Sequence, residues 1–234
     1  SVIMENIGFA ALLPMKGHSE RVKNKNIRNF AGKPLFTYVL DTLRKCKYVT
    51  DVYVDTDSKE IVQLIRRYYE DVQIIERPER LCGDMVSMND IIKYDIAQIG
   101  TKYYLQTHAT NPLLKSDTLD AACVMFIEGM DRYDSAFSVN KLQTRLYDAD
   151  GSAVNHNPDI LQRTQDLSPL YEENSNFYIF STESFQRRNA RIGEKPMMME
   201  MSKLESVDID EEQDFILAEQ LYQAFYLGMK GRGE

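Results

Sequence analysis

Short apolar runs alternate with amphipathic segments along the first 139 residues of the chain. The first run, 7–13, is apolar at nearly every position, which is typical of a strand with both faces buried in a parallel sheet. The next segment, 34–45, carries Leu35, Val39 and Leu43 at spacings of four, which predicts a helix with one apolar face. Repetition of this strand and helix unit predicts an α/β fold with a doubly wound, mostly parallel sheet.

The other expected elements follow the same two periods. Further strands are predicted at 51–55, 72–75, 102–106, 134–139, 176–180 and 197–201. Further helices are predicted after the capping sequence Thr56-Asp57-Ser58, at 89–99, at 116–127 and in the segment that follows Asp210. The strand at 197–201 is rich in methionine, which we interpret as adaptable core filling.

The pattern changes at residue 140. Segment 140–174 is polar, contains Gly151, Pro158 and Pro169, and has no helical period. It is longer than the roughly 12–15 residues beyond which unstructured loops become uncommon in compact domains. We therefore expect an insert with its own hairpin, serving as a lid or a dimerisation arm. The α/β core would then consist of residues 1–139 and 175–234.

The amino-acid composition limits the classes of binding partner that we expect for this chain. The chain has 234 residues, and its 28 Lys and Arg against 36 Asp and Glu give a formal net charge of −8. A binder of nucleic acid or of anionic membranes normally has the opposite sign, so neither is expected as a partner. The three cysteines, Cys46, Cys82 and Cys123, form no CxxC pair and suggest reduced thiols in a cytoplasmic protein. No apolar run approaches the roughly 20 residues of a membrane span.

A basic loop follows the first predicted strand. The stretch 9–29 passes from apolar residues through Pro14 to Lys16, Gly17 and His18, and then to several more cationic side chains. Cations and backbone N–H groups beyond the carboxyl end of a buried strand are typical of a phosphate site on an open α/β sheet. The alternative is a solvated basic turn, but a strongly basic loop in an acidic chain favours an anionic ligand.

An acidic pair lies near the other end of the chain. If Ser206 to Asp210 is a strand, Asp208 and Asp210 share one face, while Val207 and Ile209 face the core. Two adjacent carboxylates repel each other unless a cation lies between them, and Mg²⁺ prefers one or two carboxylates with phosphate oxygens. As an alternative, Asp210 could be a helix N-cap with Gln213 as its capping-box partner, although this would not explain Asp208.

Other polar loops follow neighbouring strands. Asp84, Ser87 and Asn89 lie in the loop after Arg77-Pro78, and His108, Thr110 and Asn111 follow the strand at 102–106. Such loops would meet at the carboxyl edge of the sheet, where a ligand crevice forms. The chain has no HExxH, GxSxG, GxGxxG or P-loop motif, which argues against a metalloprotease, an α/β-hydrolase, a dinucleotide-dependent oxidoreductase and an ordinary NTPase.

The order of these motifs resembles the acylneuraminate cytidylyltransferase (CMP-sialic acid synthetase) family over almost the whole chain. The matching segments are Leu13-Pro14-Met15-Lys16-Gly17-His18-Ser19 with Lys25-Asn26, Gly32-Lys33-Pro34-Leu35, Val54-Asp55-Thr56-Asp57, Arg77-Pro78, Ala109-Thr110-Asn111-Pro112, Glu173 to Tyr178, Ser206 to Asp210, and Ala218-Glu219. The resemblance implies a Rossmann-like fold of the nucleotide-diphospho-sugar transferase type, with an insert that builds a homodimer.

The resemblance also implies roles for individual residues. Nucleotide binding is expected from Lys16, Gly17, Ser19, Lys25, Asn26, Arg77, Ser87 and His108. Sugar binding is expected from His108, Thr110, Asn111, Arg163, Gln165, Asn174 and Tyr178, where Arg163 and Gln165 require the insert to fold over the crevice. Lys16, Lys25, Asp208 and Asp210 would be catalytic, and the two aspartates would bind Mg²⁺.

Two positions depart from the family pattern. Lys16 replaces an arginine, so a planar bidentate fork becomes a point charge. His108 replaces a glutamine, which would add a group that titrates near neutral pH. The resemblance implies Mg²⁺-dependent transfer from CTP to a 2-keto-3-deoxy sugar acid of the sialic type. Alternatives are an eight-carbon KDO-type acid, guanylyl or uridylyl transfer to another sugar, and a catalytically silent nucleotide-sugar-binding protein.

Overall fold

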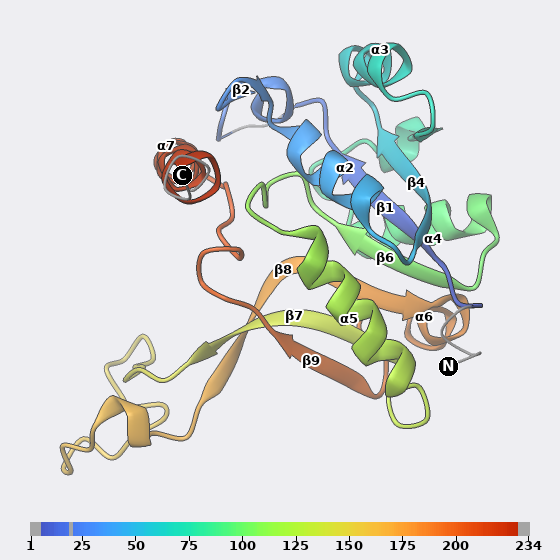
Figure 1. The fold of residues 1–234 in the computed structure, drawn as a ribbon. Coiled ribbons are helices and arrows are strands. Elements are labelled where there is room, and N and C mark those ends of the chain that lie inside the picture. Colours follow the sequence, from blue (N-terminus) through green and yellow to red (C-terminus); the bar gives the residue numbers. More distant parts are fainter. Residues whose placement is uncertain (1–5, 19–20, 229–234) are drawn as a thin grey trace.

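A mixed sheet forms the centre of the molecule. The computed structural model describes residues 6–18 and 21–228, and across these residues seven strands form the main sheet in the order β5-β4-β1-β6-β8-β7-β9 (Figure 1). The strands are β1 (Phe9–Met15), β4 (Val49–Thr56), β5 (Gln73–Glu76), β6 (Tyr103–Thr107), β7 (Ser135–Leu142), β8 (Leu170–Ser181) and β9 (Pro196–Glu200). Each lies within a few residues of a predicted strand, except that β8 begins earlier.

The pairing directions confirm a mostly parallel sheet. Strand β1 pairs in parallel with β4 and with β6, β4 pairs in parallel with β5, and β7 pairs in parallel with β9. Strand β8 is antiparallel to both β6 and β7 because the chain returns from the insert at the carboxyl edge. The carboxyl ends of β1, β4, β5 and β6 therefore share one edge.

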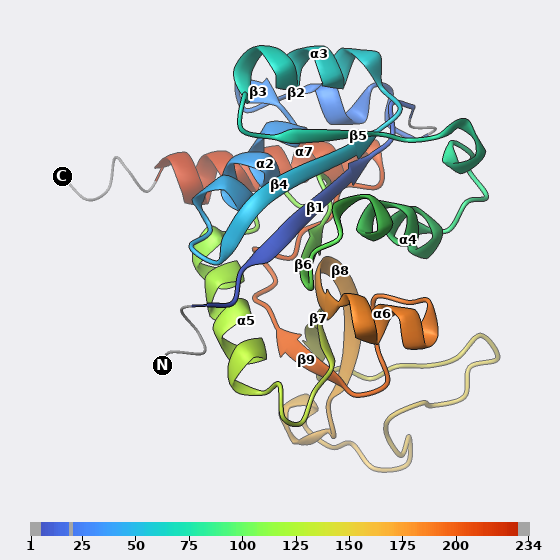
Figure 2. The same cartoon turned by 90° about the vertical axis from the view of Figure 1, so that its right-hand side faces the viewer.

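Helices cover both faces of the sheet (Figure 2). Helices α2 (Phe36–Lys45), α3 (Lys59–Tyr68) and α5 (Ser116–Glu128) contribute to the larger core cluster, with Phe9, Leu13 and Val54 of the sheet. Helices α4 (Met88–Ile99) and α6 (Thr182–Arg188) pack on the other face against Tyr104 and Phe180. The methionine-rich strand fills the core as expected, since Met199 and Met201 are buried in the larger cluster. Within the described residues, none of the helices could span a membrane.

A third core cluster lies beside the carboxyl edge and fixes the segments that will form the site. It joins Val22 of the loop after β1, Leu113 of the loop after β6, Ile209, and Phe215 of α7 (Glu212–Tyr222). A two-stranded ladder of β2 (Asn29–Phe30) and β3 (Lys33–Pro34) belongs to the same region. Short helices η1 (Lys25–Ile27), η2 (Glu79–Leu81), η3 (Thr164–Asp166) and η4 (Gln223–Leu227) complete the described structure.

Side-chain caps begin several helices. The Ser58 hydroxyl accepts a hydrogen bond from the Ile61 N–H at 3.2 Å, which confirms the predicted start of α3. The alternative interpretation of Asp210 as the N-cap with Gln213 as its partner was wrong, because Glu211 is the N-cap of α7 and Asp214 is its capping-box partner. Asp210 donates its own N–H to Asp214 and keeps its carboxylate free of a capping role.

The insert projects away from the body of the molecule (Figure 1). Strand β7 continues to Leu142 and β8 begins at Leu170, so the part outside the sheet is 143–169, shorter than the expected 140–174. An isolated bridge between Tyr147 and Ala153 is its main ladder contact, and Ile160 and Leu161 are exposed. We call residues 143–169 the arm. Its role in dimerisation stays a prediction.

Candidate active site

A cleft opens at the carboxyl edge of the sheet. It has a volume of about 420 Å³. Its lining comes from the loops after β1, β5 and β6 and from the segment before α7: Pro14, Met15, Lys16, His18, Arg21, Lys25, Asn26, Arg77, Asp84, Met88, His108, Ala109, Thr110 and Asp210. The sheet thus brings together chain segments that are far apart in the sequence, at the edge where α/β proteins bind ligands.

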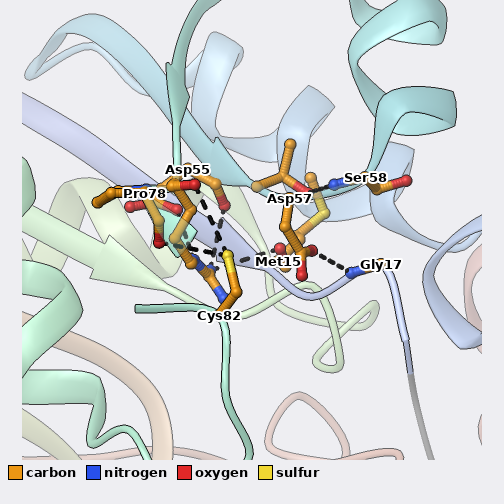
Figure 3. A network of polar contacts seen from close by, with 9 residues as sticks. Met15, Gly17, Asp55, Asp57, Ser58, Pro78 and Cys82 are labelled. Carbon is orange, nitrogen blue, oxygen red and sulfur yellow. Dashed lines mark hydrogen bonds and ion pairs between the residues drawn. The ribbon is translucent and has the colours of Figure 1, made fainter. Parts of the chain in front are cut away.

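The loop after β1 is held in place by neighbouring backbone and carboxylate groups. The Gly17 N–H donates a hydrogen bond to Asp57 Oδ1 at 2.7 Å (Figure 3). A Cβ atom at position 17 would lie 2.9 Å from Ser58 Cβ, so glycine allows the close approach. The Asn26 side chain donates to the Lys16 carbonyl at 2.9 Å. Gly17 and Asn26 therefore shape the loop, while Ser19 lies outside the described residues.

Three cations of this loop line the cleft. Lys16 Nζ lies 3.7 Å from Asp84 Oδ1, and both side chains are largely exposed. Lys25 Nζ donates to the Ile209 carbonyl at 3.1 Å, which places it next to the acidic pair. Burial lowers the pKa of Lys25, and the fields of Asp210 and Asp208 oppose that shift. With Arg21, these side chains present positive charge to an anionic ligand.

Asp208 and Asp210 are brought together, although their segment is not a strand of the sheet. The Ile209 side chain is buried in the third core cluster and its N–H donates to the Thr110 carbonyl at 3.0 Å, which turns the flanking carboxylates outward. Asn111 Nδ2 donates to Asp208 Oδ1 at 3.2 Å. Burial raises the pKa of Asp208 to about 6, the Thr110 hydroxyl opposes this shift, and Asp210 adds to it.

The carboxylate oxygens of Asp208 and Asp210 are the possible metal ligands of this segment. Among the described residues, no group of three or more His, Cys, Asp or Glu side chains is placed to hold a metal ion. Two adjacent carboxylates still fit Mg²⁺, which keeps several positions for water and for phosphate oxygens. The repulsion between Asp208 and Asp210 is what a bound cation would relieve.

Arg77 lines the cleft from a buried ion pair. Its Nε lies 2.7 Å from Asp55 Oδ1, and both side chains are almost fully buried. A second buried carboxyl group, Asp95 of α4, faces Asp55, and burial together with Asp55 raises the pKa of Asp95 far above its ordinary value. The guanidinium pairs with Asp55, and only its field acts on Asp95, where it opposes the rise in pKa. The buried ion pair with Asp55 thus fixes the side chain of Arg77 at the wall of the cleft.

His108 lines the cleft and belongs to a polar cluster. Its Nε2 lies 3.3 Å from Gln106 Nε2 and 3.5 Å from Arg191 Nη1. Burial, followed by the charges of Arg191 and Lys25, lowers the pKa of His108 to about 3. The expectation that His108 titrates near neutral pH was therefore wrong, because its surroundings disfavour the imidazolium. Tyr178 joins this cluster through Arg191, which stacks on its ring.

Several expected ligand-binding residues have structural roles. Ser87 caps α4 by accepting from the Asp90 N–H at 3.2 Å, and Met88 lines the cleft instead. Asn174 is buried and hydrogen bonded to Ser138 and Asn140. Thr110 and Asn111 contact Asp208, so they hold the acidic pair.

Arg163 and Gln165 lie on the exposed arm and do not line the cleft of their own chain. Arg163 Nε pairs with Asp166 at 2.8 Å. The structure thus does not bring these two residues to the cleft within one subunit. Their expected role in sugar binding stays a prediction that requires a second chain.

Sequence reasoning assigned no role to Gln106, Met88 or Arg191. Gln106 lies in an apolar strand and could have been recognised as a polar side chain at the carboxyl end of β6. Arg191 lies between α6 and β9 in a segment without a motif, so nothing in its spacing points to the site. Arg21 was part of the basic stretch but had been given no separate role.

Comparison with known proteins identifies the family of the chain. A protein-family model described as cytidylyltransferase matches residues 10–230. The pseudaminic acid cytidylyltransferase of Campylobacter jejuni is 24% identical over 225 residues, covering 91% of this chain and 95% of the relative. The N-acylneuraminate cytidylyltransferase A of Danio rerio is 28% identical over 229 residues, covering 94% of this chain and 52% of that protein.

A solved structure supports the fold. The CMP:2-keto-3-deoxy-manno-octonic acid synthetase in complex with CTP superposes with a TM-score of 0.66 at 12% sequence identity. The match covers 93% of this chain and 99% of that protein. At this identity the likeness concerns the arrangement of strands and helices.

Proposed function

The chain belongs to the cytidylyltransferase family and is a nucleotidyltransferase, and we propose that it transfers the cytidylyl group of CTP to a nonulosonic acid. Such an acceptor is a 2-keto-3-deoxy sugar acid of the sialic type. The observation that carries the proposal is that Lys16, Arg21 and Lys25 line one cleft with Asp210, and that Asp208 lies near enough for its field to act on Lys25. Cations suit the triphosphate, and a carboxylate pair suits the Mg²⁺ that accompanies it.

The reaction follows from these groups. The anomeric C2 hydroxyl of the acid attacks the α-phosphorus, a C2–O–P bond forms, and the bond from the α-phosphorus to the pyrophosphate oxygen breaks. The hydroxyl proton passes through water to one of the two carboxylates, Asp208 or Asp210, and pyrophosphate leaves. Lys16 and Lys25 stabilise the charge that develops on the phosphate oxygens. Catalysis is mainly positioning and charge neutralisation, as in other phosphoryl-type displacements.

Asp208 and Asp210 would hold Mg²⁺. When bound, the ion would neutralise charge on the phosphates and orient the α-phosphorus. Support comes from the raised pKa of Asp208, which burial causes and to which the neighbouring Asp210 adds, while Lys25 opposes the shift. Thr110 and Asn111 keep Asp208 in place through their side chains.

We propose a homodimer in which the arm of each subunit packs on the other. The arm exposes apolar side chains that its own chain leaves uncovered, namely Tyr147, Val154, Ile160 and Leu161. Arg163 and Gln165 of one subunit would then reach the cleft of its partner and contribute to acid binding. The projection of the arm away from its own subunit supports this arrangement (Figure 1).

Pyrophosphate release tests the function directly. The purified protein with Mg²⁺ is mixed with each of the four NTPs in turn, against pseudaminic, legionaminic, N-acetylneuraminic and KDO-type acids. Release that requires CTP and one nine-carbon acid supports the proposal and identifies the acceptor. Release with the eight-carbon KDO-type acid alone would move the protein to that substrate class. CTP binding without release from any pair would favour the silent binding protein, for which Lys16 and His108 are the motivating departures.

A further inference from the structure

Arg191 lies beside the cleft in the loop between α6 and β9. Its Nη1 donates to Gln106 Oε1 at 2.6 Å and lies 3.5 Å from His108 Nε2. The guanidinium carbon is 3.9 Å from the centre of the Tyr178 ring, which places the cation over the aromatic face. The side-chain groups that contact Arg191 are therefore an amide, an imidazole and a phenol.

The positive charge of Arg191 is not neutralised by a carboxylate. Within the described part of the chain, no acidic side chain lies within ion-pair distance of Arg191, whereas the buried Arg77 pairs with Asp55 at 2.7 Å. Glu173 is the acidic group whose field reaches Arg191, but the Tyr178 hydroxyl donates to the Glu173 carboxylate. Burial lowers the pKa of Arg191. A half-buried guanidinium without a carboxylate partner has an unfavourable desolvation free energy. A bound anionic ligand would reduce this free-energy cost.

The loop that carries Arg191 is anchored at several points. The Arg191 N–H donates to Asn89 Oδ1 of α4 at 3.3 Å, next to Met88 in the cleft wall. The Gly193 N–H donates to Ser135 Oγ at 2.8 Å, and Arg188 donates to the Gly193 carbonyl at 2.7 Å. The guanidinium is thus held in position before any ligand arrives, which reduces the entropy cost of binding.

The cationic side chains at the cleft come from two parts of the chain. Lys16, Arg21 and Lys25 belong to the loop after β1 and line the cleft, and we assign them to the triphosphate. Arg191 lies next to His108, which also lines the cleft, and contacts Gln106 and Tyr178. The second obligate anion of the proposed reaction is the carboxylate of the sugar acid. A guanidinium offers a planar pair of N–H donors that matches a carboxylate better than it matches a hydroxyl or an amide.

We propose that Arg191 binds the carboxylate of the acid co-substrate and makes that carboxylate a requirement for the reaction. This inference rests on the proposed function. Gln106 and Tyr178 orient the guanidinium. Because the imidazole of His108 is neutral, Arg191 supplies the single positive charge of this cluster. The proposal adds a specificity-determining residue from a segment that carries no motif.

The test compares steady-state constants for two substrates and two variants. The acid is the one that supports pyrophosphate release with CTP, and its methyl ester serves as the uncharged analogue. Arg191→Gln should raise the KM for the acid by about 10- to 100-fold, since charge-assisted hydrogen bonds contribute on this scale. The KM for CTP should stay within about twofold, and Arg191→Lys should recover part of the loss.

The methyl ester separates a carboxylate contact from a general disturbance of the site. The wild-type protein should prefer the acid over its ester, and Arg191→Gln should lose most of that preference. Arg188→Gln is the matched control, because it removes a tether of the same loop but leaves the guanidinium of Arg191 in place. It should keep both the acid KM and the preference for acid over ester.

Each outcome bears on one proposal. An unchanged acid KM in Arg191→Gln, or an unchanged preference for acid over ester, would overturn the role of Arg191 while the enzyme remains a cytidylyltransferase. Loss of CTP binding or a drop in melting temperature in Arg191→Gln, matched by Arg188→Gln, would show that the residue only maintains the loop. Absence of release by the wild-type protein with every pair would instead contradict the proposed function.

Discussion

The Gly17 N–H and the Asp57 carboxylate form a 2.7 Å hydrogen bond that ties the loop after β1 to the turn after β4. Two neighbouring parallel strands thus end in loops that hold each other at the mouth of the cleft. The contact requires a close approach, since a Cβ atom on residue 17 would lie 2.9 Å from Ser58 Cβ and 3.2 Å from Ser58 Cα. The conformation of the proposed triphosphate loop therefore depends on the absence of a side chain at Gly17.

Substitution of Gly17 tests this dependence. Gly17→Ala should displace the loop from Asp57, at a cost of about 1–3 kcal/mol that is typical of overpacking. We expect the KM for CTP to rise by about tenfold or more, measured by pyrophosphate release. Gly83→Ala is the matched control, because its Cβ would meet only Val86 at 3.6 Å, an ordinary contact. Equal effects of the two substitutions would contradict the role given to the Gly17 contact.

The acidic pair is tested by neutralisation. Asp208→Asn and Asp210→Asn should each lower kcat by about 100-fold or more, because each removes a proposed Mg²⁺ ligand. The melting temperature should change little, since an amide at position 208 can still contact Asn111 and Thr110. Asp84→Asn serves as the control at the rim of the cleft, where its carboxylate pairs only loosely with Lys16. Full activity of Asp208→Asn at all Mg²⁺ concentrations would exclude the metal assignment.

The buried Asp95 should make stability depend on pH. Its pKa is raised far above the ordinary value of 3.8 by burial and by Asp55, so the folded protein keeps a proton that the unfolded chain releases. The folded state then binds more protons, and the free energy of unfolding falls as pH rises from about 4 through neutral values. Asp95→Asn should flatten this slope and raise stability by about 1–2 kcal/mol above neutral pH.

Urea unfolding at pH 5, 7 and 9 measures the slope for Asp95. Asp90→Asn on the same helix is the control, because Asp90 is exposed. If Asp95→Asn is strongly destabilised at every pH, the protein needs the Asp95 carboxyl group as an ion. That result would contradict the raised pKa of Asp95.

His108 should not contribute to the pH dependence of the reaction. Burial and two neighbouring cations lower its pKa to about 3, so it stays neutral across the range in which the enzyme is assayed. His108→Gln should therefore preserve the shape of the kcat/KM profile between about pH 5.5 and 8, even if the rate changes. A wild-type profile with a limb near 6.5 that disappears in His108→Gln would show that the imidazole titrates after all.

The proposed position of the arm predicts that each active site contains residues of both subunits. If Arg163 contributes to the cleft of the partner subunit, the homodimers of Arg163→Ala and of Lys25→Ala should each lose activity. In each of these homodimers, both clefts lack one of the two side chains. Mixing and re-equilibrating the two variants should restore about a quarter of the wild-type activity, since half of the dimers are mixed and one cleft in each is intact. Leu161→Asp should weaken the dimer in light scattering. Absence of restored activity in a mixture that exchanges subunits would place Arg163 outside the partner's cleft.

Periodicity predicted the elements that lie inside the core. The strand and helix alternation was clear because β1 buries a continuous apolar run, while α2 and α3 each present one apolar face. The position of β8 between β6 and β7 could not be read in the same way, since pairing order depends on contacts across the sheet. The early start of β8 was missed because Leu170 to Glu173 are exposed and carry no apolar pattern.

Spacing correctly predicted that Asp208 and Asp210 lie close together. Ile209 has to be buried, so the flanking Asp208 and Asp210 meet even though no strand forms there. Spacing could not show that some polar side chains have structural roles. The Ser87 hydroxyl, for example, caps the start of α4. Arg191 was missed because its partners Gln106, His108 and Tyr178 come from other strands and loops. Only the folded chain brings those four side chains together.

The ladder at the base of the arm has a consequence for how this protein can change over time. Val139 to Leu142 pair with Leu170 to Glu173, so both ends of the arm enter and leave the sheet side by side. Residues 143–169 can thus gain or lose length without shifting the register of any core strand. Selection can therefore change the length of the arm while the residues at the carboxyl edge of the sheet keep their places.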